Sequence, residues 1–190
     1  LWKLINEQGW LALDVPEDDG GLGFSTVEAS ILSEVSGYYL PIIPLFSSGV
    51  VFKHLLLNSN TYIKNKLLPE IISGEKIGTF ALYESDKYEI GDDTIESNLA
   101  SSGDGMLLNG TKKYVMFGDV SDYIAVLTKS NDGFKFVFVE AKQQGVEIVQ
   151  TPSLDQSRPL AEVTFTDVVI EPENIMIELD QELSIWNKVQ

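Results

Sequence analysis

Two different periodicities divide the hydrophobic pattern of the chain. Up to about residue 75, apolar side chains recur every three or four positions, which is typical of amphipathic helices. From residue 77 onward, short apolar runs alternate with polar positions and are separated by turn residues, which is typical of strands. The sequence therefore predicts a segregated α+β fold, in which a helical bundle is followed by an antiparallel β-barrel or sandwich.

The first two helices are predicted from end signals as well as from periodicity. Residues 2–9 indicate a short helix that ends at a glycine. Ser25 and Glu28 have the spacing of a capping box, in which each side chain accepts from the backbone N–H of the other residue, so a second helix is expected to begin there. Gly37 is the expected stop of this second helix. Its apolar side chains that share one face are Val27, Ile31 and Val35.

Proline and glycine delimit the next two helices. Pro41 and Pro44 mark the start of a helix that runs past Leu55. Residues 61–72 form another helix, and Gly74 ends it.

The strands are predicted from short alternating runs and from two turn signals. The Asn109-Gly110 pair favours the positive φ angles of a tight hairpin, and Asn131-Asp132-Gly133 indicates a second hairpin. The runs that read as strands are residues 79–83, 106–112, 123–127, 134–139 and 163–166. We therefore predict a helical domain over residues 1–76, a middle β-domain over 77–177, and the start of a third, helical domain over 178–190.

Composition and charge exclude several classes of function. The chain has 190 residues, 44% of them hydrophobic, and a formal net charge of −16. Such a surface repels nucleic acid and anionic membranes. The absence of cysteine removes disulfides and thiolate chemistry. No apolar stretch is long enough to span a membrane and no signal peptide is visible, so we expect a cytoplasmic protein.

Four motifs occur in an order that resembles the acyl-CoA dehydrogenase family. Residues 9–23 read GWLALDVPEDDGGLG, residues 68–75 read LPEIISGE, residues 108–115 read LNGTKKYV, and residues 161–168 read AEVTFTDV. Each resembles a stretch of the N-terminal helical domain or the middle β-domain of that family. The resemblance covers nearly the whole chain and implies a divergent branch without the C-terminal helical domain.

The resemblance implies a flavoprotein oxidoreductase of fatty-acid and lipid metabolism. Its cofactor would be FAD, its substrate an acyl-CoA thioester oxidised at the α,β bond, and its electron acceptor an electron-transfer flavoprotein or similar protein. The whole protein would be a homo- or hetero-oligomer. The catalytic base is expected in the missing C-terminal domain, so no catalytic residue is assigned and this part of the chain is expected to be inactive alone.

The resemblance also implies a set of cofactor-binding residues. Tyr83 and Glu84 lie where the family has Thr-Glu, and Tyr114, Val115 and Met116 lie where it has Trp-Ile-Thr. A tyrosine hydroxyl can reach a flavin edge, and Tyr114 can stack on the isoalloxazine ring. Met116 has no hydroxyl, so a hydrogen bond there must come from a backbone N–H.

Other interpretations of these residues stay open. Glu84 can equally be a solvated loop residue, and Tyr114 a packed sheet residue. With two threonine positions lost, the protein can be a non-catalytic partner subunit or a degenerate member without flavin. A third interpretation treats the β-half as a stand-alone binding module, which poor packing of residues 1–76 on it would favour.

The remaining polar motifs are expected to be structural. His54 is predicted to be a helix-surface residue. Arg158 can pair with a carboxylate or approach the ligand, and a structural ion pair is the favoured role. The glycines of residues 20–23 suit a helix-entry turn better than a phosphate loop. An acidic cluster is expected to be a solvated face and no metal site. Its members are Asp86, Glu89, Asp92, Asp93 and Glu96.

Overall fold

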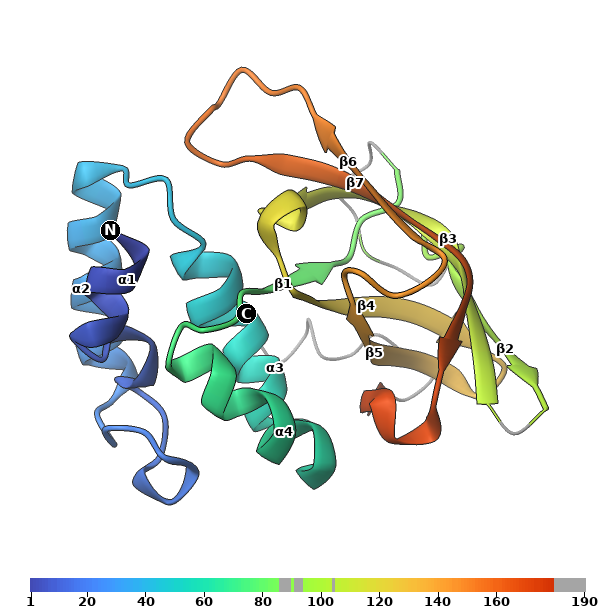
Figure 1. Cartoon of the computed structure of the whole chain (residues 1–190), viewed down its shortest axis with the longest axis horizontal. Coiled ribbons are helices and arrows are strands. Elements are labelled where there is room, and N and C mark those ends of the chain that lie inside the picture. Colours follow the sequence, from blue (N-terminus) through green and yellow to red (C-terminus); the bar gives the residue numbers. More distant parts are fainter. Residues whose placement is uncertain (86–89, 91–93, 104, 180–190) are drawn as a thin grey trace.

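A helical half precedes a sheet half in the computed structural model, which describes residues 1–85, 90, 94–103 and 105–179 (Figure 1). The helices are α1 (Trp2–Glu7), α2 (Thr26–Tyr39), the π-helix η3 (Leu45–Phe52), α3 (Lys53–Leu57) and α4 (Thr61–Ile72). The strands are β1 (Gly78–Ala81), β2 (Asn98–Ser102), β3 (Gly105–Met116), β4 (Tyr123–Ser130), β5 (Gly133–Glu140), β6 (Val146–Thr151), β7 (Leu160–Ile170) and β8 (Ile175–Leu179). The predicted α+β class is confirmed.

Two helix starts follow the predicted local chemistry. The Ser25 backbone N–H donates to the Glu28 carboxylate at 2.9 Å, and the Val27 N–H donates to the Ser25 hydroxyl at 3.2 Å, so the capping box forms. Helix α4 covers the predicted residues 61–72, with the Asn60 side chain accepting from the Ile63 N–H at 2.9 Å. These ends form because the capping groups are close in sequence.

Helix α2 differs from the prediction at its end and on its face. It runs through Gly37 to Tyr39 and ends where Leu40 adopts a left-handed conformation with φ 45°. The following Pro41 disfavours a helical conformation at Leu40, which explains why the helix stops there and not at the glycine. The predicted apolar face does not lie in a core. Val27 is 63% exposed, Ile31 56% and Val35 45%.

The helix predicted after Pro44 begins at Leu45, but its first turns are π-helical. The π-helix η3 continues directly into α3. The Ser48 hydroxyl is buried and accepts from the Gly78 N–H at 3.0 Å, which ties η3 to the first strand. Long π-helices are rare and often lie at functional sites.

The glycines of residues 20–23 form a closed turn. The Gly21 N–H donates to Pro16 O at 3.0 Å and the Gly23 N–H donates to Val15 O at 2.9 Å. A Cβ at Gly21 would lie 2.0 Å from Val15 O, so only glycine fits this close backbone approach.

The strands form one eight-stranded sheet with the order β6-β7-β3-β2-β4-β5-β8, and β1 pairs with β4. Most pairs are antiparallel, as predicted, but β4 pairs in parallel with both β1 and β2. Successive residues of β4 point to opposite faces of the sheet. Ala125 and Leu127 join the core beneath the helices, whereas Ile124 and Val126 join a second core within the curled sheet.

One of the two predicted hairpins is wrong. Asn131 and Asp132 do connect β4 to β5, as predicted. Asn109 and Gly110 instead lie inside β3, at a bulge in its pairing with β7. The positive φ of Gly110, 144°, serves this bulge, and a Cβ there would lie 2.5 Å from the Cβ of Ser97.

The helical half packs closely on the sheet. The Tyr123 hydroxyl donates to the Glu70 carboxylate at 2.6 Å, and the Ile77 N–H donates to the Asp122 carboxylate at 3.0 Å. A shared core joins side chains of both halves, among them Phe52, Leu56, Ile63, Leu67, Ala125 and Phe138. This packing argues against the β-half as a stand-alone module.

The predicted domain boundaries stay a prediction, although the last helix of the first half ends at Ile72 and the first strand begins at Gly78. The predicted start of a third domain falls almost wholly on residues 180–190, outside the described residues. None of the helices in the described part is both long and apolar enough to cross a membrane.

Candidate functional site

The backbone of β3 departs from regular strand geometry where the cofactor residues were predicted. A bulge interrupts its pairing with β7 between Lys112 and Val115. Within it, Tyr114 has φ 57°, and Phe117 just beyond the strand has φ 53°. Left-handed conformations of bulky residues are strained, by about 1–3 kcal/mol each, and cluster at functional sites. The strain therefore marks this segment as a candidate site.

Hydrogen bonds bring the two predicted segments together. The Lys113 N–H donates to Tyr83 O at 2.7 Å, so the segment that follows β1 lies beside β3 at this point. The buried Thr79 hydroxyl donates to Met116 O at 2.6 Å. Tyr83 and Tyr114 are both half-buried. Residues predicted from two separate stretches of sequence thus lie close together, Tyr83 in the segment after β1 and Tyr114 in β3.

The Glu84 carboxylate is engaged by the protein itself. It accepts from the Lys112 ammonium, from the Ser97 N–H at 2.9 Å and hydroxyl at 2.6 Å, and from the Glu96 N–H at 2.6 Å. Its side chain is only 7% exposed. Burial raises the pKa of Glu84, but Lys112 and the hydrogen bonds from Ser97 hold that pKa below its ordinary value. These contacts favour a supporting role for Glu84, and its predicted cofactor contact stays a prediction.

Lys112 is a fully buried lysine beneath this site. Its ammonium donates to Leu82 O at 3.2 Å in addition to Glu84. Burial lowers the pKa of Lys112 to about 8, although the Glu84 carboxylate opposes that shift. The pair joins β3 to the segment that carries Tyr83 and to the residues before β2.

The other two predicted residues differ in accessibility. Val115 is 1% exposed and its side chain lies in the core within the sheet, so it can offer a ligand only backbone groups. Met116 is half-buried and lines a cavity of about 320 Å³ between the sheet and the helices. The cavity wall is mostly apolar. Its residues are Ser33, Ser36, Gly37, Leu40, Pro41, Ile43, Leu45, Phe46, Ser47, Val50, Met116, Phe117, Ser157 and Arg158.

This cavity was not predicted, because its residues come from segments far apart in sequence. The end of α2 and the π-helix η3 form one side, and the end of β3 forms the other. The Phe117 N–H donates to Pro159 O at 2.8 Å and holds the loop before β7 against the end of β3. The two prolines at 41 and 44 were the only local signal, since they displace the chain between the helices.

The ion pair predicted for Arg158 is not formed within the part of the chain that the structure describes. The nearest candidate, Asp155, instead accepts from the Ser157 N–H at 2.9 Å and hydroxyl at 2.6 Å. The prediction was wrong because a carboxylate three residues away caps its own turn.

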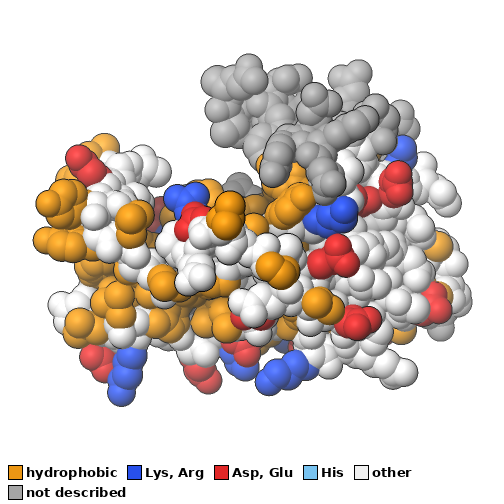
Figure 2. Space-filling view, turned by 90° about the horizontal axis from the view of Figure 1, so that it is seen from above, with side chains coloured by type: hydrophobic (Ala, Val, Ile, Leu, Met, Phe, Trp, Pro, Cys, Tyr) orange, Lys and Arg blue, Asp and Glu red, His pale blue; other side chains and the backbone are white. Residues whose placement is uncertain are grey.

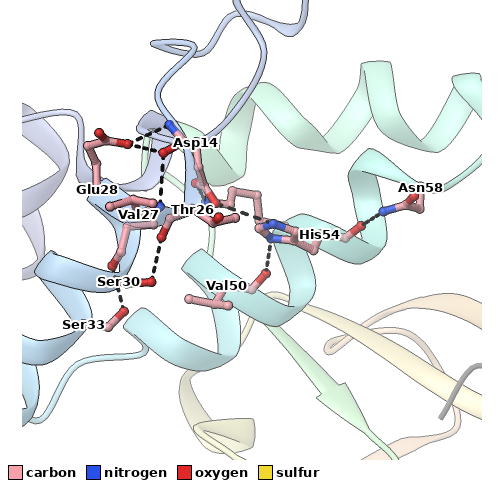
Figure 3. A network of polar contacts seen from close by, with 12 residues as sticks. Asp14, Thr26, Val27, Glu28, Ser30, Ser33, Val50, His54 and Asn58 are labelled. Carbon is pink, nitrogen blue, oxygen red and sulfur yellow. Dashed lines mark hydrogen bonds and ion pairs between the residues drawn. The ribbon is translucent and has the colours of Figure 1, made fainter. Parts of the chain in front are cut away.

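A second polar cluster lies in the helical half (Figure 3). The buried Lys53 ammonium pairs with the Asp14 carboxylate. His54 lies beside it, with Nε2 3.5 Å from Asp14 Oδ2 and Nδ1 2.9 Å from Val50 O. Its side chain is 43% exposed, so it does lie on the helix surface as predicted. The Asp14 contact was not predicted, because 39 residues separate it from Lys53.

The predicted acidic face lies mostly outside the described residues, with only an exposed Glu96 within them. Among the described residues, no three His, Asp or Glu side chains are grouped so as to hold a metal ion. Figure 2 shows that apolar side chains gather instead over the helical end of the molecule. Exposed members of this surface include Phe24, Val27, Ile31, Val35, Tyr38, Tyr39, Leu40, Ile42 and Phe46.

Comparison with known proteins shows which proteins the chain is similar to. Residues 1–75 match the model of the acyl-CoA dehydrogenase N-terminal domain. Mitochondrial isovaleryl-CoA dehydrogenase of Bos taurus is 29% identical over 136 residues, which cover 69% of this chain and 31% of that protein. The chain thus spans about a third of the length of this curated relative.

Solved structures share the fold. A glutaryl-coenzyme A dehydrogenase in complex with glutaryl-CoA has a TM-score of 0.85 and 22% identity over 97% of this chain and 49% of its own. A glutaryl-CoA dehydrogenase from Mycobacterium smegmatis in complex with FADH2 has a TM-score of 0.83 and 20% identity over 96% of this chain and 48% of its own. At such identities the likeness concerns the fold alone.

Proposed function

We propose that the whole protein is an FAD-dependent dehydrogenase of acyl-CoA thioesters, because residues 1–75 match the N-terminal domain of the acyl-CoA dehydrogenase family and the fold is that of such enzymes. The observation that carries the proposal is the strained segment of β3 around Tyr114, which is bonded through Lys113 to the backbone of Tyr83 and reaches the cavity at Met116. A bound flavin would supply the hydride acceptor that no side chain can provide.

The residues present fit a flavin edge in three respects. Tyr83 and Tyr114 are half-buried aromatic residues with hydroxyl groups, in the segment after β1 and in β3. The bulge in β3 turns the backbone at Tyr114 out of regular strand geometry, as is common next to ligand sites. Met116 lines an apolar cavity next to this point. Tyr114 would stack on the ring, and backbone N–H groups of Val115 and Met116 would donate to it.

The other residues of the site would position these groups. The Lys112–Glu84 pair fixes the segment that carries Tyr83 against β3. The Thr79 hydroxyl holds Met116 O and fixes the backbone beside the cavity. The apolar wall excludes water from a bound acyl group, which strengthens polar contacts to its thioester. The base that removes a proton from the substrate is expected outside this chain.

The proposed partners follow from the same reasoning. An acyl-CoA thioester is the proposed substrate, and an electron-transfer flavoprotein or similar protein the proposed acceptor. A homo- or hetero-oligomer is proposed for the whole protein, and a cytoplasmic location stays a prediction.

Flavin binding tests this proposal. The purified whole protein is mixed with FAD, freed of unbound cofactor by gel filtration, and examined by absorbance spectroscopy. We expect retained flavin absorbance, and an affinity about tenfold lower in Tyr114→Gly, because that variant loses the stacking ring. Glycine suits the left-handed backbone at 114, so the variant is expected to fold. Tyr39→Ala, at an exposed tyrosine, is the control. A colourless wild-type protein would contradict the proposal.

A non-catalytic subunit is the alternative, and one observation favours it. Met116 directs an apolar side chain to the cavity at a position where a hydroxyl would serve a flavin. Retained flavin together with acyl-CoA-dependent dye reduction by the whole protein would exclude this alternative. Loss of both would support it.

A further inference from the structure

Arg158 is the single arginine of a chain with a net charge of −16. It lies in the loop between β6 and β7, exposed to solvent, at the wall of the 320 Å³ cavity. Its neighbours in that wall are mainly apolar and include Leu40, Ile43 and Phe117. A guanidinium thus borders an apolar cavity in a protein that is otherwise rich in carboxylates.

Arg158 differs from many of the chain's other cations because no carboxylate among the described residues lies within ion-pair distance of it, although the hydrogen bonds from Ser157 and, to a smaller extent, the charge of Arg158 lower the pKa of Asp155. Lysines that pair with a carboxylate include Lys3, Lys53, Lys64, Lys76, Lys112 and Lys135. Within the described residues, no carboxylate forms an ion pair with Arg158, although 29 acidic residues are present in the chain. Its five donors are therefore available to a ligand.

The loop holds Arg158 at the cavity. The Phe117 N–H donates to the carbonyl of Pro159, the next residue. On the other side, Ser157 is fixed by two hydrogen bonds to Asp155. Both attachments flank Arg158 directly, so its backbone is restrained while its side chain keeps its rotamers. A positioned guanidinium suits carboxylate and phosphate groups, which it binds through two parallel hydrogen bonds.

We propose that Arg158 anchors the anionic group of an amphiphilic ligand whose apolar part occupies this cavity. The inference rests on the proposed function and deepens it, since an acyl-CoA thioester is such an amphiphile. The shared chemistry is an anion linked to an apolar chain. The anion comes either from the phosphates of the CoA part or from the carboxylate of a free fatty acid.

The volume and the wall agree with this class of ligand. A cavity of about 320 Å³ is within the range of small-molecule sites, which are roughly 300–1,000 Å³ and mostly apolar with few polar groups. The serines of the wall provide hydroxyls, and the Ser36 hydroxyl is buried without a hydrogen-bond partner in the described residues. Such a hydroxyl is available to a polar atom within the ligand.

Calorimetric titration with three probes tests the proposal and separates the two sources of the anion. The probes are palmitoyl-CoA, palmitic acid and CoA without an acyl group. For wild type we expect measurable binding of palmitoyl-CoA. For Arg158→Gln we expect binding about 10- to 100-fold weaker, because a hydrogen-bonded charge is lost. Arg158→Lys should recover part of it, since lysine keeps the charge without the paired donors.

Two further variants isolate the parts of the site. Lys142→Gln removes one positive charge from an exposed residue of the β5–β6 turn and should leave affinity within about twofold. Leu40→Asn removes an apolar wall while suiting the positive φ there, and should weaken palmitoyl-CoA more than CoA. Loss of palmitic acid binding in Arg158→Gln would assign the carboxylate, and loss of palmitoyl-CoA binding alone would assign the phosphates.

Three outcomes would overturn the proposal: no binding of any probe by wild type, equal affinity of wild type and Arg158→Gln, or equal losses in Arg158→Gln and Lys142→Gln. Flavin absorbance is recorded for the same samples with and without FAD. A colourless protein that still binds palmitoyl-CoA through Arg158 contradicts the proposed function alone. A flavin-bound protein that is indifferent to Arg158 contradicts this inference alone.

Discussion

Each half of the molecule contains a buried lysine paired with a carboxylate, yet the two pairs have different surroundings. Lys112 and Glu84 in the sheet half form a closed network, in which the carboxylate also accepts from Ser97 and Glu96. Lys53 and Asp14 in the helical half border a second cavity, of about 340 Å³, beside the partly exposed His54 (Figure 3).

The difference shows what a buried ion pair does in each place. Glu84 accepts from the N–H of the buried Ser97 as well as from Lys112, so the pair joins three segments beneath the candidate site. Asp14 lies in a loop and contacts Lys53 and His54 of α3. The adjoining cavity gives water access to Asp14. We therefore expect the sheet pair to matter more for folding and for the placement of Tyr83.

The largest effect is expected for Lys112→Met. This change leaves the Glu84 carboxylate buried without its cation, which costs about 3–5 kcal/mol of the free energy of unfolding. Urea unfolding followed by circular dichroism measures it, with Lys142→Met as the exposed control, expected to change stability by less than about 0.5 kcal/mol. A loss below about 1 kcal/mol would show that the network is not closed to water.

A smaller loss is expected for Lys53→Met. Asp14 keeps His54 within 3.5 Å and borders the cavity, so we expect about 2 kcal/mol by the same measurement. If Lys53→Met costs as much as Lys112→Met, the contrast between the two halves fails.

The third prediction concerns pH and should give about 2 kcal/mol. The pKa of Lys112 is about 8 in the folded protein, because burial lowers it, and about 10.4 in the unfolded chain. Between these values the unfolded state binds more protons, so the contribution of Lys112 to stability rises with pH. The stability of wild type relative to Lys112→Met should therefore increase by about 2 kcal/mol from pH 7 to pH 9.5 in paired urea titrations. A constant or shrinking difference would show that Lys112 is hydrated in the folded state.

The candidate site could be predicted from the sequence only in part. The family resemblance pointed to Tyr83 and Tyr114, and the structure joins the segment of Tyr83 to β3 through the Lys113–Tyr83 hydrogen bond. The sequence did not reveal that Glu84 is satisfied by Lys112 and Ser97, because these residues lie 28 and 13 positions away. The cavity at Met116 was also missed, since its walls come from both halves.

The sequence by itself determined those features that depend on near neighbours. The capping box at Ser25, the helix over residues 61–72, the hairpin at Asn131-Asp132 and the α+β order all follow from groups a few residues apart. Such interactions form in whatever environment the segment later meets.

Tertiary structure decided the rest. It placed Asn109 and Gly110 at a bulge inside β3 and left the apolar face of α2 exposed. It also placed Arg158 at the wall of a cavity and not beside a carboxylate. In each case the local sequence preference was compatible with more than one structure. The choice depended on which distant segment packed against it, because strand pairing and burial are set by contacts that no short stretch of sequence contains.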